Sequence, residues 1–141
     1  MAANLRVVLD TNCVLSSISP SSPNSIIMDY LMAGKYSISV TTEILMEYEE
    51  KLIEIFNSVI SSNFFTALMV LENVEFINIY FHLSLISADL DDNKFSDCAF
   101  ASNSDYLVTN DKHFNILKAT NFPHINIISN EEFIEILKEL K

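Results

Sequence analysis

The alternation of strand-forming and helix-forming segments constrains the fold of this chain more than any other feature of its sequence. Short runs rich in Val, Ile and Tyr alternate with longer segments whose apolar residues recur at helical spacing. The runs that predict strands are residues 5–9, 36–40, 74–80, 105–109 and 124–129. The segments that predict helices are residues 12–18, 26–34, 41–56, 61–72, 94–104, 111–118 and 130–141. This alternation predicts an α/β fold in which helices cover both faces of a parallel sheet.

The length and composition predict one domain over residues 1–141. Half of the 141 residues are apolar, and no linker or internal repeat interrupts the pattern. No apolar run is long enough to span a membrane, and the first residues do not resemble a signal peptide, so we expect a cytoplasmic protein that has no contact with a membrane. Cys13 and Cys98 lie among apolar residues, and we expect two buried thiols.

The charge and the glycine content exclude several classes of function. The net charge of −11 argues against a protein that coats nucleic acid through a broad basic face, although an enzyme can still hold nucleic acid through metal ions. Gly34 is the single glycine, so no glycine-rich phosphate-binding loop is present.

Two aspartates lie just past the ends of predicted strands. Asp10 ends the run "LRVVLD", and Asp111 ends "LVTND". An aspartate in such a place often only caps a helix. However, ligands of parallel α/β folds bind at the carboxyl ends of the strands. We therefore expect Asp10 and Asp111 to share one edge of one sheet.

Other acids can join this pair. Asp92 opens the segment "DNKFSDCAF", Asp97 lies five residues further on, and Glu47 precedes a core position, Tyr48. Two carboxylates about 5 Å apart repel by about 3 kcal/mol at an effective dielectric constant near 20. A hard divalent cation relieves this repulsion, and because no His or Cys is expected nearby, Mg²⁺ or Mn²⁺ fits better than Zn²⁺.

Three stretches of the sequence form an ordered set of motifs: "VVLDTNCVLSS", "TTEILMEY" and "DLDDNKFSDCAFASNSDYLVTNDKHF". Together they resemble the PIN domain family, in the branch of VapC-like toxin components of toxin–antitoxin systems, and the resemblance extends over roughly residues 5–130. It implies a three-layer α/β/α sandwich with a central parallel sheet. It also implies a metal-dependent ribonuclease, because many members of the family have this activity.

The resemblance assigns roles to individual residues. It implies that the four catalytic acids are Asp10, Glu47, Asp92 and Asp111. Of these, Asp10, Asp92 and Asp111 would bind the Mg²⁺ or Mn²⁺ ion, whether as one ion or two. The residues implied to orient these acids are Thr11, Asn12, Asp97 and Thr109.

The expected function is that of an endoribonuclease that cleaves RNA phosphodiester bonds, acts as a toxin, pairs with a protein antitoxin and forms a homodimer. Lys94 and Lys112 lie close to the acids in sequence, and we expect them to contact RNA phosphates at the rim of the cleft. The alternative is a catalytically weak PIN fold that serves as a binding or assembly module. A phosphatase of the haloacid dehalogenase type would need an aspartate at position 12, where Asn12 stands.

We expect structural rather than catalytic roles for the remaining candidate residues. His82, His113 and His124 are scattered in sequence, which favours surface or core positions over catalysis. Phe64, Phe65, Leu68 and Met69 are expected to form part of the core or of an oligomer contact.

Overall fold

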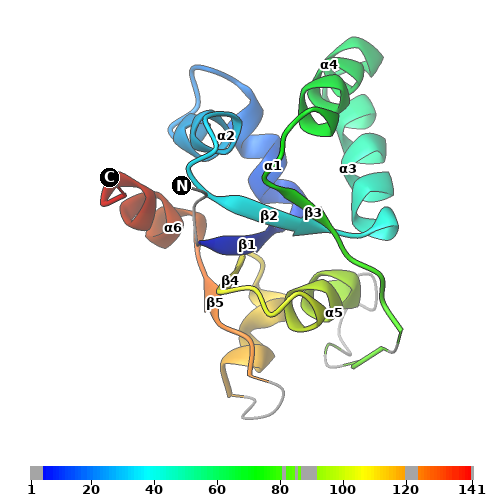
Figure 1. Ribbon diagram of the computed structural model, residues 1–141, viewed down its shortest axis with the longest axis vertical. Helices are drawn as coiled ribbons and strands as arrows, with labels where there is room; N and C mark the ends of the chain where they lie inside the picture. Colours follow the sequence, from blue (N-terminus) through cyan, green and yellow to red (C-terminus); the bar gives the residue numbers. More distant parts are fainter. Residues whose placement is uncertain (1–4, 81, 85, 87–91, 120–123, 141) are drawn as a thin grey trace.

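The computed structural model describes residues 5–80, 82–84, 86, 92–119 and 124–140. In this described part, five parallel strands form one sheet in the order β3-β2-β1-β4-β5 (Figure 1). The strands are β1 (Arg6–Leu9), β2 (Ser37–Val40), β3 (Val74–Phe76), β4 (Tyr106–Val108) and β5 (Ile127–Ile128). All five predicted strands are therefore present, and the predicted parallel sheet is confirmed.

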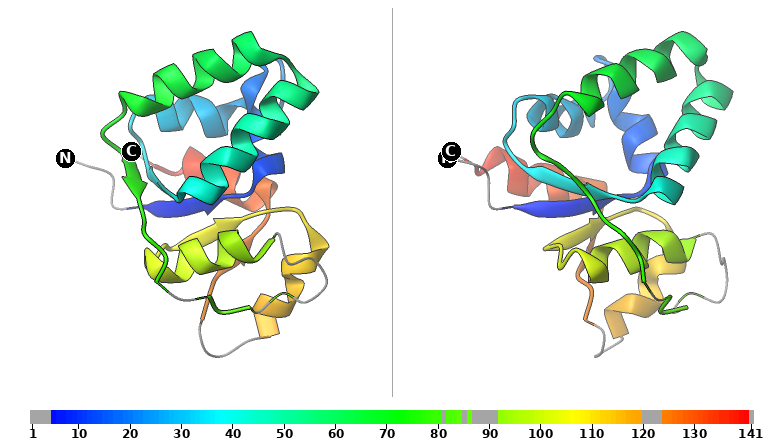
Figure 2. Two further views of the ribbon diagram at one scale, coloured as in Figure 1. Left: turned by 90° about the vertical axis from the view of Figure 1, so that its right-hand side faces the viewer. Right: turned by 45° about the vertical axis from the view of Figure 1, so that its right-hand side comes forward.

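Helices cover both faces of the sheet (Figure 2). The helices on one face are α1 (Thr11–Ile18), α2 (Ser25–Met32), α3 (Thr42–Ile55) and α4 (Ser58–Met69). Helix α6 (Asn130–Lys138) packs against α2. The opposite face carries α5 (Asn93–Ala101) and the 3₁₀ helix η2 (Lys112–Ala119). The predicted three-layer α/β/α sandwich is confirmed.

The core lies between the sheet and these helices. Val7, Val8 and Leu107 are completely buried, as expected for strands that are covered on both faces. The Tyr48 hydroxyl donates a hydrogen bond to the carbonyl oxygen of Leu9 at 2.5 Å, and this bond fixes α3 to the end of β1. Burial of a tyrosine requires such a partner for its hydroxyl group.

Some element boundaries differ from the sequence predictions. Helix α4 begins at Ser58 rather than near residue 61, because the side chain of Asn57 caps it by accepting a hydrogen bond from the Ile60 backbone nitrogen. Strand β3 ends at Phe76, four residues before the predicted end. Residues Lys112–Ala119 form a 3₁₀ helix.

The prediction of two buried thiols is confirmed. Cys13 and Cys98 are buried free thiols. Gly34 follows the end of α2 with a φ of 74°, a backbone conformation that favours glycine. Thr41 caps α3 through its side chain, which accepts a hydrogen bond from the Ile44 backbone nitrogen. No helix in the described ranges combines the length and apolar character needed to cross a membrane.

Candidate active site

The strand order brings the ends of β1 and β4 together. The chain passes from β1 to β2 and β3 on one side of β1, and it later returns to β4 on the other side. The register pairs Leu9 of β1 with Val108 of β4. Asp10 and Thr109, the residues that come next, therefore lie beside each other at the ends of these strands. A position where the strand order reverses is the usual ligand site of an open parallel sheet. The structure therefore places Asp10 and the segment that contains Asp111 at this edge.

Asp10 occupies the N-cap position of α1, but its side chain makes no capping hydrogen bond. Its carboxylate faces β4 instead, where the Thr109 hydroxyl donates to Asp10 Oδ2 at 2.8 Å. The same Thr109 oxygen accepts a hydrogen bond from the Asp111 backbone nitrogen at 2.9 Å. Thr109 thus connects the two aspartates that follow the strands.

Burial dominates the electrostatics of Asp10. The residue is 5% exposed, and this desolvation raises the pKa of its carboxyl group from 3.8 to about 6. The hydrogen bonds from Thr109 and from the Thr11 backbone oppose the shift, whereas the negative charges of Asp111 and Glu47 add to it. A buried carboxylate next to two other acids favours a bound cation.

Glu47 reaches this region from α3. Its neighbour Tyr48 is fixed to β1, so Glu47 lies beside the start of α1, where the Thr11 hydroxyl donates a hydrogen bond to Glu47 Oε2. The other carboxylate oxygen of Glu47 pairs with Lys94 Nζ at 2.7 Å. The Lys94 side chain is only 15% exposed, so it is largely enclosed beside Glu47.

Asp92 enters from the opposite face of the sheet. It occupies the N-cap position of α5, and like Asp10 it makes no capping hydrogen bond with its helix. The rings of Phe95 in α5 and Phe114 in η2 pack edge to face with centroids 6.3 Å apart. This contact holds the start of α5 beside the start of η2, which directly follows Asp111.

His113 also belongs to the site. Its Nδ1 atom lies 3.3 Å from Asp92 Oδ2 and 3.5 Å from Asp111 Oδ1. Asp92, Asp111 and His113 each offer one ligand atom, and these atoms all lie within 4.8 Å of one another. The expectation that no histidine lies near the acids is therefore wrong. The segment Asp111-Lys112-His113 shortly after a strand was a sequence signal for this arrangement.

The other predicted orienting residues lie differently. Asp97 is buried, and its carboxylate accepts a hydrogen bond from the Leu83 backbone nitrogen at 3.0 Å and lies 2.9 Å from His82 Nδ1. These contacts hold residues 82–83 and involve none of the four acids. Asn12 is exposed on the first turn of α1. Asp89 and Asp91, which lie near Asp92 in sequence, fall outside the described residues.

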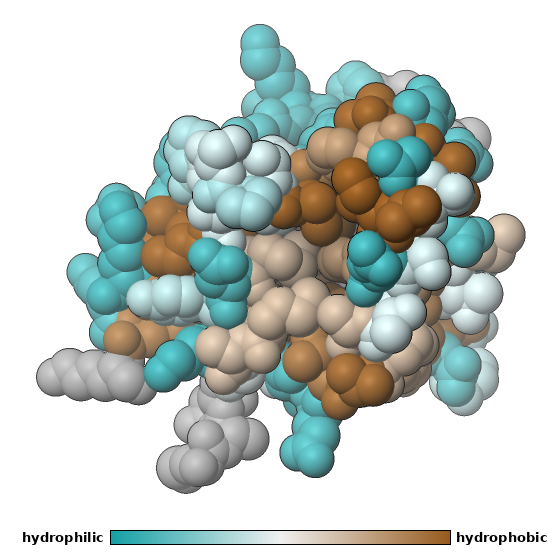
Figure 3. Space-filling view, turned by 90° about the horizontal axis from the view of Figure 1, so that it is seen from above, coloured by the Kyte–Doolittle hydropathy of each residue, from teal (hydrophilic) through white to brown (hydrophobic). Residues whose placement is uncertain are grey.

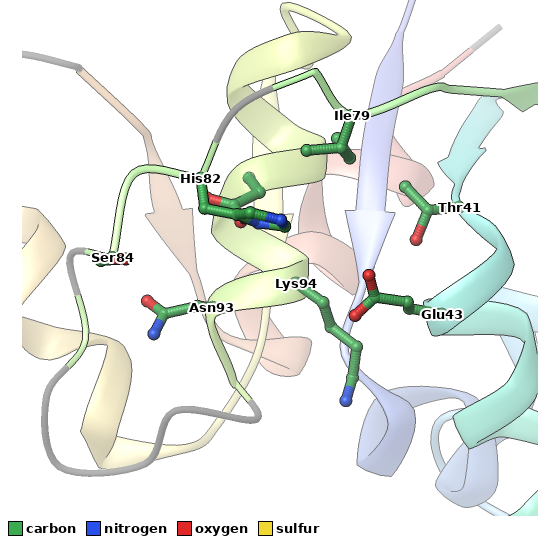
Figure 4. A pocket seen from close by; sticks show the side chains of 8 residues that line it. Thr41, Glu43, Ile79, His82, Ser84, Asn93 and Lys94 are labelled. Atoms are coloured by element: carbon green, nitrogen blue, oxygen red, sulfur yellow. The ribbon is translucent and has the colours of Figure 1, made fainter.

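A pocket of about 300 Å³ is lined in part by Lys94, the ion-pair partner of Glu47 (Figure 4). Thr41 and Glu43 form one wall, and His82 and Asn93 lie opposite them. Lys94 reaches across its lower end toward α3. Lys112 lies exposed beside Asp111, at the first position of η2.

A comparison with protein families identifies the fold family. The family model described as the PIN domain matches residues 6–113 of this chain, which is more than half of its length. The chain belongs to the PIN domain family. The match includes all four acids and His113.

Solved structures support the same fold for this PIN domain. VapBC2 from Rickettsia felis bound to a DNA fragment from its promoter has a TM-score of 0.58 and 16% identity. DNA-bound VapBC from Salmonella typhimurium has a TM-score of 0.59 and 17% identity. Each match covers 89% of this chain and 98% of the other.

A third solved structure extends the likeness beyond toxin–antitoxin complexes. The PIN domain endonuclease Utp24 has a TM-score of 0.50 and 18% identity, and the match covers 88% of this chain and 84% of that one. Among curated proteins, none matches this sequence.

Proposed function

We propose that this PIN domain is a Mg²⁺- or Mn²⁺-dependent endoribonuclease and the toxin of a toxin–antitoxin pair. The observation that carries this proposal is the convergence of acids from several elements at one edge of the sheet. Asp10 follows β1, Glu47 lies on α3, Asp92 precedes α5 and Asp111 follows β4. Membership of the PIN domain family supports a nuclease rather than another use of clustered acids.

The donor set fits a divalent cation. Asp10, Asp92 and Asp111 would bind the ion, since carboxylate oxygens are the preferred ligands of Mg²⁺ and Mn²⁺. The raised pKa of Asp10 reflects a buried charge that a cation would stabilise. When bound, the ion polarises a phosphodiester and lowers the pKa of water.

The protein's own groups would supply the remaining steps. Thr109 holds the Asp10 carboxylate in position. Glu47 lies beside the site with a side chain that is 23% exposed, and it can accept the proton of the attacking water. Lys94 and Lys112 would contact phosphates of the RNA strand. Because Lys94 is paired with Glu47, its contact with RNA would compete with that pair.

The acidic rim supports an antitoxin of basic character. A groove of about 460 Å³ along α3 is lined by Glu43, Met46, Glu47, Glu49, Glu50 and Lys94. An arginine or lysine of the antitoxin would be attracted to this groove by the net charge of −11. We place this protein in the cytoplasm, where both the antitoxin and the RNA substrate would be found.

Exposed apolar residues support the proposed homodimer. Ile53 of α3, Val59 and Met69 of α4 and the adjoining Val70 are each at least 46% exposed. Figure 3 shows apolar side chains gathered on the side of the molecule where α3 and α4 lie. Among the α4 residues that we expected in the core or in an oligomer contact, Phe64 and Leu68 belong to the core, and Met69 faces outward. Covering these exposed side chains with a second copy would remove apolar surface from water.

A cleavage assay tests the proposed activity. Labelled RNA is incubated with the protein in Mg²⁺ or Mn²⁺, with and without EDTA, and Asp10→Asn is compared with Asp29→Asn, whose aspartate is exposed on α2. We expect cleavage by the wild type and by Asp29→Asn, and loss of cleavage with EDTA or Asp10→Asn. RNA binding without cleavage by the wild type would instead identify the catalytically weak binding module.

A further inference from the structure

His113 has a half-exposed side chain, and its imidazole nitrogen lies close to two carboxylates that belong to the proposed metal site. In tetrahedral or octahedral shells with metal–ligand distances of about 2.1 Å, neighbouring ligand atoms lie about 3.0–3.4 Å apart. His113 Nδ1 lies 3.3 Å from Asp92 Oδ2 and 3.5 Å from Asp111 Oδ1. These separations match the edge of a coordination shell with the imidazole nitrogen at one corner.

The local backbone places His113 beside Asp111. The His113 backbone nitrogen donates to Asp111 Oδ1 at 2.9 Å, so the turn that holds the carboxylate also holds the histidine. The next residue, Phe114, is completely buried and packs on Phe95. Since Phe95 lies in the first turn of α5, the same packing determines the separation between His113 and Asp92.

We propose that His113 is a direct nitrogen ligand of the metal ion and that it gives the site a preference for Mn²⁺ over Mg²⁺. Mg²⁺ strongly prefers oxygen ligands, whereas imidazole binds first-row transition metals well. A site of carboxylates alone would discriminate little between the two ions. This inference rests on the proposed metal-dependent function and adds to it the ligand that determines the choice of ion.

A second histidine provides a matched control. His82 Nδ1 lies 2.9 Å from Asp97 Oδ2, so it too pairs with a buried aspartate, but that aspartate contacts residues 82–83 rather than the acids of the site. If an imidazole–carboxylate contact anywhere on the protein affected metal affinity, His82→Gln and His113→Gln would have the same effect. The proposal expects an effect from His113→Gln alone.

The experiment combines calorimetry with electron spin-echo spectroscopy of bound Mn²⁺. In the wild type and in His82→Gln, we expect modulation from a directly bonded ¹⁴N nucleus. In His113→Gln, this modulation should disappear and the ratio of Mn²⁺ to Mg²⁺ affinity should fall about tenfold. Mg²⁺ affinity should change little, since the glutamine amide oxygen can replace the nitrogen as a hard ligand.

The possible outcomes separate this inference from the proposed function. Wild-type protein that binds Mn²⁺ without nitrogen modulation would overturn the ligand assignment, whatever the stability of His113→Gln. An unchanged Mn²⁺ to Mg²⁺ ratio in His113→Gln would overturn it as well and would leave His113 only an ion-pair partner of the two aspartates. If neither ion binds to the wild type, the metal site of the proposed function fails, and this inference fails with it.

Discussion

Thr109 Oγ1 donates to Asp10 Oδ2 over 2.8 Å and joins two residues that lie 99 positions apart in the chain. The contact crosses from β4 to β1 at the edge where the strand order reverses. The same hydroxyl accepts from the Asp111 backbone nitrogen, so one side chain determines how both aspartates lie. The loss of this hydroxyl should therefore affect stability and metal binding together.

Thr109→Val tests this connection. The substitution keeps the shape of a buried side chain but removes the acceptor of the Asp111 backbone nitrogen and the side-chain donor to Asp10 Oδ2. We expect the free energy of unfolding to fall by about 1–3 kcal/mol, the range for unsatisfied buried polar groups. Urea denaturation in EDTA measures this change. Thr109→Ser, which retains the hydroxyl, is the control, and equal stability of the valine and serine variants would contradict the assigned role.

Asp10 makes the metal-free protein less stable at neutral pH than in acid. Its pKa is about 6 in the folded protein and 3.8 in the reference state, so the folded state binds the proton more tightly. The stability contributed by the protonated form is complete below about pH 4 and is lost as the pH rises through about 6. Asp10→Asn removes this titration. In EDTA we expect it to be more stable than the wild type at pH 8 by up to roughly 3 kcal/mol, and nearly equal at pH 3.5.

Denaturation at a series of pH values checks this expectation, with Asp29→Asn as the control for loss of an exposed aspartate. A constant difference between Asp10→Asn and the wild type from pH 3.5 to pH 8 would show that burial does not raise the pKa of this carboxyl group.

Removing one of the carboxylates that we propose as metal ligands should abolish most metal affinity. Asp111→Asn and Asp10→Asn would each delete a proposed anionic oxygen ligand, and we expect Mn²⁺ affinity to fall at least tenfold in each variant. Calorimetric titration with Mn²⁺ measures this. Unchanged Mn²⁺ affinity in both variants would mean that these two acids are not ligands of the ion.

Lys112 should contribute to RNA binding through its charge alone. It is exposed beside Asp111, whereas Lys94 is largely enclosed and paired with Glu47. In the Asp10→Asn background, we expect Lys112→Ala to reduce the salt dependence of single-stranded RNA binding by about 0.7 in slope. Lys94→Ala should weaken binding as well, and the double variant most of all, particularly at low salt. Titrations at several salt concentrations measure this, with Lys35→Ala, whose lysine is exposed after α2, as the control.

If the double variant binds RNA with the affinity and slope of the parent, the two lysines are not phosphate contacts. The metal ion would then be the main contact between this acidic protein and its substrate.

Local sequence patterns were sufficient to predict the elements and several of their ends. Apolar runs predicted each strand, and apolar residues at helical spacing predicted α6, which begins with a capping box between Ser129 and Glu132. The position of Asp10 and Asp111 after strands was also a local feature, because it depends only on where an apolar run stops. In contrast, the end of β3 depends on its pairing with β2, which no local pattern reports.

The sequence by itself determined which residue types stand at the carboxyl ends of the strands, since periodicity and composition act over a few neighbouring residues. Only the tertiary structure decided which of them meet. The placement of β4 beside β1 brings Thr109 to Asp10, and the packing of Phe114 on Phe95 brings His113 to Asp92. The pair of Glu47 and Lys94 likewise joins α3 to α5. Such contacts between distant residues depend on how the helices and the sheet pack in three dimensions, and the spacing of residues along the chain does not encode that packing.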